Sequence, residues 1–137
     1  MPNELSRDDG ISVSIALSLA NPAATATTNL LAPQGNLSGF IVPAGYKFHP
    51  LLLSGVSNAD LTAGTATFKV TDDDTELVNG PAPVLSDTVQ QASAVARVGA
   101  QPIAAAHKVG ISVTTDASYA PVTADLDAVL IGILLPA

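Results

Sequence analysis

The strongest constraint on the fold is a strict two-residue repeat near the start of the chain. In "ISVSIALSLA", residues 11–20, large aliphatic side chains fill every odd position up to Leu19, and Ser or Ala fills every even one. This period places the aliphatic side chains on one face of a β-strand. The other face carries small, uncharged side chains where a solvent-exposed strand usually carries charge. We therefore expect this second face to pack against another layer or a neighbouring subunit.

The rest of the chain repeats the pattern of short apolar segments between Gly- and Pro-containing turns. The Val, Ile, Leu and Thr content predicts the main further strands at about 47–57, 65–71, 107–116 and 126–135. Pro50 is expected at an edge or a bulge. Residues 89–98 fit either a short helix or a strand, and the surrounding strands favour a strand. No convincing amphipathic helix of about 12 residues or more is present.

These elements predict a single all-β domain over 11–137, preceded by a flexible or arm-like N-terminus at 1–10. About eight antiparallel strands are expected, arranged as a β-sandwich or a jelly-roll-like fold. A fold of alternating strands and helices would need helices that the sequence does not supply.

Charge excludes several classes of partner. The net charge is −7, and the five cations lie far apart in the sequence, at Arg7, Lys47, Lys69, Arg97 and Lys108. No cluster is present that would neutralise a row of phosphates, so we expect no direct nucleic-acid binding and no attraction to an anionic membrane. Charged residues make up only 12% of the chain, against about 25% in ordinary domains. Such a surface suits a protein covered by copies of itself or by a partner.

The ends of the chain show no targeting signal. "MPNELSRDDG" is polar and of mixed charge, which predicts neither a secretory signal nor a transit peptide. The longest apolar run is far shorter than the ~20 residues of a membrane helix. The absence of cysteine excludes disulfides and thiolate metal sites, and it is consistent with assembly in a reducing compartment.

The C-terminal "ADLDAVLIGILLPA" predicts a strand that is apolar on both faces. One face can fill a sandwich core, but the same core cannot cover the other. We interpret the second face as a candidate subunit interface, formed by Val129, Ile131, Ile133 and Leu135. Burying each of the first three is expected to contribute about 1.5–3 kcal/mol.

No set of residues predicts catalysis, a cofactor or a bound metal. Asp72–Asp74 and Glu76 offer carboxylates, but the spacing of a calcium-binding loop is absent, so a solvated turn is expected. The two histidines, His49 and His107, have no cysteine partner for zinc and are expected to be structural or exposed. Several carboxylates could be paired for glycoside hydrolysis, but the chain has no Trp to bind a sugar: Asp60, Asp87, Asp116, Asp125 and Asp127. We therefore expect a protein that is not an enzyme.

The stretch from Phe40 to Pro136 resembles small β-sandwich domains of tailed-bacteriophage virions, especially capsid decoration (cement) proteins. In those domains one strand typically reads L-x-x-G-x-x-x-x-x-V, which Leu61, Gly64 and Val70 match. A second strand carries G-x-x-V and leads through a polar loop to an apolar last strand, as at 109–113 and 126–134. The resemblance covers about two-thirds of the chain and leaves out its first forty residues.

The resemblance implies a non-enzymatic virion protein that binds the outside of a phage capsid and stabilises the shell. Its partners would be the major capsid protein and copies of itself, with a homotrimer favoured, and it would be assembled in the host cytoplasm. The alternative is a receptor- or glycan-binding head domain of a tail fibre or spike. Such a domain would bind through loop residues, for which the candidates are Tyr46, His49 and Tyr119.

Overall fold

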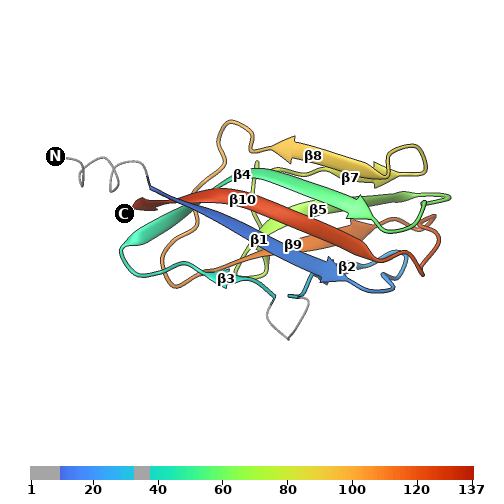
Figure 1. Cartoon of the computed structure of the whole chain (residues 1–137), viewed down its shortest axis with the longest axis horizontal. Helices are drawn as coiled ribbons and strands as arrows, with labels where there is room; N and C mark the ends of the chain where they lie inside the picture. The colour runs from blue at the N-terminus through green and yellow to red at the C-terminus, as the bar shows by residue number, and fades with distance from the viewer. Residues whose placement is uncertain (1–9, 33–37) are drawn as a thin grey trace.

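Ten strands form the computed structural model, which describes residues 10–32 and 38–137 (Figure 1). The strands are β1 (Ile11–Leu19), β2 (Thr27–Asn29), β3 (Phe40–Ile41), β4 (Tyr46–Ser57), β5 (Thr65–Asp72), β6 (Thr75–Glu76), β7 (Val84–Ser86), β8 (Gln91–Val95), β9 (Lys108–Thr115) and β10 (Leu126–Pro136). In the described ranges, no helix is long and apolar enough to span a membrane. The arm expected at 1–10 lies, except for Gly10, outside the described residues.

The strands form two sheets that pack face to face. A four-stranded sheet has the order β1-β10-β4-β8 and lies at the front in Figure 1. A six-stranded sheet lies behind it, with the order β2-β9-β5-β6, and β3 and β7 pair with β9 and β5 respectively. Every strand pair is antiparallel. This confirms the predicted antiparallel β-sandwich.

The count of ten strands reduces to the expected eight when two interrupted strands are recognised. β2 and β3 pair with different parts of β9, on the side away from β5. β6 and β7 likewise pair with different parts of β5, on the side away from β9. Treating each as one broken strand gives the strand order of a jelly roll, in which the first strand pairs with the last and the last with the third.

The two-residue repeat determines which side chains fill the space between the sheets. In β1 the odd positions face inward, with Ile15 and Leu17 buried, and in β10 the even positions do. Phe48 and Phe68 are fully buried in the centre of the core. The inward position Gly132 carries no side chain because the Phe48 ring occupies that space.

The strand predictions are confirmed with small shifts at the ends. Residues 89–98 contain a strand, β8, and no helix. Pro50 lies beside a shift in the β4–β10 register between Ile131 and Gly132, as expected for a proline at a bulge. The shift leaves Leu51 as the extra residue of β4, exposed to solvent.

Candidate functional site

The four-stranded sheet presents an outer face that is almost free of charge. Strand register places side chains from all four strands side by side on it. Its central row runs Ser14–Ile131–Leu52–Val95, and the next row runs Ala16–Val129–Ser54–Ser93. One flanking row is Ser18–Asp127–Val56–Gln91, and the rows at the other end are Ser12–Ile133–His49 and Leu135–Lys47. We call these side chains together the outer face.

Large aliphatic side chains of the outer face remain in contact with solvent. Val129 and Ile131 are 37% and 40% exposed, and Val95 is 67% exposed. The inward residues of the same strand, Leu126 and Leu130, are fully buried. β10 therefore has the two unequal faces that its sequence predicts, and all four predicted interface residues of β10 lie on the outer one. That a subunit covers them stays a prediction.

The two charges of the outer face lie at its opposite ends. Lys47 stands in register with Leu135 near the end of β10, and Asp127 stands near its beginning. Within the described part of the chain, neither residue has an ion-pair partner. The face thus combines an apolar centre with one charge of each sign that has no ion-pair partner among the described residues.

A shallow hollow opens on the outer face beside Asp127. It has a volume of about 160 Å³ and is lined by side chains and backbone of β4, β8 and β10, namely Ser54, Gly55, Val56, Gln91, Asp127, Ala128 and Val129. Gly55 faces the core, where a Cβ would meet the Phe68 ring, so it contributes only backbone to this hollow. The hollow can accept an apolar side chain and offers one carboxylate to a positive group.

The end of the molecule that carries Asp127 is acidic. Its loops carry four carboxylates and, in the described residues of 20–26, 58–64, 87–90 and 116–125, no Lys or Arg; Asp127 at the start of β10 adds a fifth: Asp60, Asp87, Asp116, Asp125 and Asp127. We call this the acid end; it lies on the right in Figure 1. Two of these carboxylates hold loops in place: Asp116 accepts hydrogen bonds from Thr65 and Ser118 N, and Asp125 accepts one from Asn21 N.

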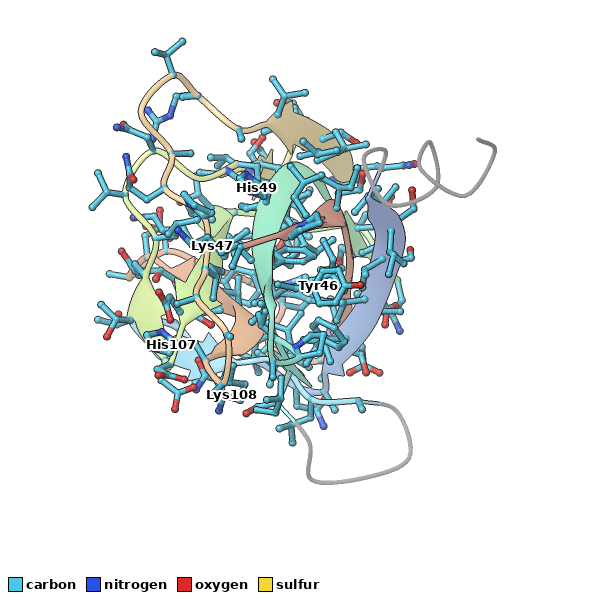
Figure 2. All side chains as sticks on the ribbon, turned by 90° about the vertical axis from the view of Figure 1, so that its left-hand side faces the viewer. Tyr46, Lys47, His49, His107 and Lys108 are labelled. Atoms are coloured by element: carbon cyan, nitrogen blue, oxygen red, sulfur yellow. The ribbon has the colours of Figure 1, made fainter. Side chains whose placement is uncertain are left out.

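A second cluster lies at the other end, which faces the viewer in Figure 2. The acidic turn after β5 meets the start of β9, where His107 Nδ1 lies 2.7 Å from Asp72 Oδ1 and 3.6 Å from Asp73 Oδ2. Lys108 completes the cluster, since its Nζ lies 2.9 Å from Asp74 Oδ1 and its backbone N–H donates to Asp73 Oδ1. The hydrogen bond with Asp72 raises the pKa of His107 above 6.5, and desolvation opposes that rise.

The cluster is the one place in the described ranges where three metal-ligand side chains meet. The ligand atoms of Asp72, Asp73 and His107 lie within 4.8 Å of one another. A nitrogen and two carboxylate oxygens could hold a divalent cation. These atoms are half exposed and already hydrogen bonded to one another and to the Lys108 backbone. We assign the cluster a structural role, because it ties the β5–β6 turn to β9.

The three residues proposed as loop contacts do not form one binding surface. Tyr119 is only 3% exposed and belongs to the core. Tyr46 and His49 lie within β4 and are half-buried, and Figure 2 shows Tyr46 on the opposite side of β4 from Lys47. The structure therefore gives no support to a glycan- or receptor-binding loop made of these residues.

The fold is shared with a protein of known structure. A chain of the acidic stable capsid structure of Helicobacter pylori bacteriophage KHP30 aligns with a TM-score of 0.51 and 12% sequence identity. The alignment covers 93% of this chain and 90% of that chain. No protein-family model matches this chain, and neither does any curated protein.

Proposed function

We propose that this chain is a non-enzymatic structural protein of a phage virion, which binds the outside of the capsid and stabilises the shell. The observation that carries the proposal is the outer face, because an exposed sheet surface rich in Val, Ile and Leu is suited to contact with protein. The fold shared with a chain of the KHP30 capsid supports the virion setting. The major capsid protein is the proposed partner on the shell.

The proposed mechanism is burial of surface without chemistry. A protein that bridges neighbouring capsid subunits resists their separation because apolar and polar contacts must be broken when the shell expands or ruptures. Low surface charge lowers the desolvation penalty for such contacts. Nothing in this mechanism needs a cofactor or a metal.

The test uses shells of the phage that encodes the chain, assembled without it. Added wild-type protein should sediment with the shells up to a fixed copy number and raise the temperature at which they rupture. Ile131→Asp should reduce the bound amount, because it places a carboxylate at the centre of the outer face. Val98→Asp is the matched control: Val98 is fully exposed in a turn outside that face, so this variant should bind like the wild type. Wild-type protein that never sediments with shells would refute the proposal.

A further inference from the structure

We infer that the outer face pairs with the outer face of a second copy of this chain, with the two sheets antiparallel and related by a two-fold axis. The inference rests on the proposed assembly function only in treating this face as an interface. It names a second copy as the occupant of the outer face, so the pair would meet the shell through its remaining surface, and Ile131→Asp would weaken shell binding by breaking the pair.

Charge selects the orientation. A two-fold axis that runs across the strands, over the central row, places each end of one face on the opposite end of the other. Lys47 of one copy then lies over the row that contains Asp127 of the second copy, and the same contact occurs again on the other side of the axis. The opposite arrangement would stack the two acid ends, with five carboxylates each, and like charges repel.

The hollow beside Asp127 fits the side chain that this orientation delivers. The row that carries Lys47 in one copy lies over the row of Asp127 and Val56 in the other. The long aliphatic stem of lysine can lie against Val56 and Val129 in the hollow, while its ammonium reaches the Asp127 carboxylate. At the axis, Ile131 packs against Ile131 of the second copy, and the small side chains of Ser14 and Ala16 let the sheets approach.

The area of the face is close to that of a small specific interface. β1, β10 and β4 give a width of about 14 Å over the nine residues from Asp127 to Leu135, a length of about 26 Å, and β8 widens the face only along Gln91–Val95. Each copy therefore contributes about 450 Å² of flat area, and the two together approach the ~1,000 Å² that specific interfaces need. A two-fold pair differs from the homotrimer that the resemblance implies, since a face that binds itself closes after two copies.

The test is a charge exchange followed by mass in solution. The wild-type chain at tens of micromolar should have twice the monomer mass of 13.7 kDa. Lys47→Asp and Asp127→Lys should each weaken pairing at least tenfold at low salt, because each places two like-charge contacts in the dimer. An equimolar mixture of the two variants should pair again, because a Lys47→Asp chain and an Asp127→Lys chain restore both opposite-charge contacts. Circular dichroism confirms that both variants are folded, as expected for two exposed positions.

Three results would overturn the inference: a monomeric wild type, a trimeric mass, or a mixture that pairs no better than its components. The shell experiment is independent of these results. A monomeric wild type that sediments with shells would leave the proposed function intact and refute the pairing. A wild-type dimer that never sediments with shells would support the pairing and refute the proposed function.

Discussion

Gly132 provides a direct test of how closely β10 packs on β4. A Cβ atom at this position would overlap the tip of the Phe48 ring, with Phe48 Cε1 at 2.6 Å and the His49 carbonyl oxygen at 2.7 Å. Phe48 is fully buried and the carbonyl belongs to a strand, so neither can move aside without disturbing its neighbours. Gly132→Ala should therefore destabilise the fold, although alanine is generally the better residue in a strand.

Two opposing effects determine the size of the loss. Forcing one carbon atom into a packed core costs about 1–3 kcal/mol. Alanine also restricts the unfolded chain, which returns about 0.4–1 kcal/mol where no positive φ is required. The expected net loss is about 1–2 kcal/mol, which lowers the midpoint of thermal unfolding by about 4–8 °C in a chain of this size.

Thermal and urea unfolding followed by circular dichroism measure this loss. Gly80→Ala is the matched control, because a Cβ there has its nearest neighbour at 3.4 Å and should leave stability nearly unchanged. In a Phe48→Leu background, which lacks the ring tip, Gly132→Ala should cost at least about 0.5 kcal/mol less. A Gly132→Ala variant that unfolds at or above the wild-type temperature would refute the packing described here.

Four other predictions address the core and the buried or paired polar groups. Leu130→Ala, which empties a fully buried position, should cost about 2–5 kcal/mol in urea unfolding; a loss under about 1 kcal/mol would contradict its place in the core. His107 should titrate above 6.5 by NMR and return toward that value in Asp72→Asn. Because the folded-state pKa of His107 is raised, the contribution of the His107–Asp72 pair to stability is fully present below about pH 6.5 and is lost as the pH rises through the raised value. A His107 titration without this upward shift would contradict the ion pair with Asp72. Tyr119→Phe should keep or raise stability, because the buried Tyr119 hydroxyl has no hydrogen-bond partner among the described residues; a clear loss would reveal a partner such as a buried water. Burial, and secondarily Asp125, should hold the pKa of Tyr119 above 10 in a spectrophotometric titration.

Alternation in the sequence was sufficient to predict two strands of the four-stranded sheet, β1 and β10, and which of their side chains face the core. In β1 and β10 the period of two records directly which side chains face the core, because each strand has one core on one side only. The same pattern identified Val129 and Ile131 as the residues of a second face. It could not identify Leu52 and Val95 as their neighbours, because that requires the register of three strands.

The histidine cluster was not predictable for a related reason. Asp72 and His107 are 35 residues apart, and their contact follows from the pairing of β5 with β9. Asp72 and Val109 are register partners at the end of that pairing, which brings the acidic turn to the residues just before β9. A prediction that β5 and β9 are adjacent would have suggested the cluster. The opposite charges at the two ends of the outer face could be predicted only with the strand pairing known. Lys47 and Asp127 are 80 residues apart in the sequence and share a face only through β4–β10 pairing.

The place of β10 in the four-stranded sheet has a consequence for synthesis of the chain. β10 follows the other nine described strands in the sequence, yet it lies between β1 and β4, which do not pair with each other. While the ribosome is still making β10, β1 has no partner in this sheet and β4 has only β8. Since pairing across such a long separation is slow to form, the outer face is completed only after residue 136 has emerged. A chain cut before β10 therefore lacks the strand that joins β1 to β4 and cannot form the outer face.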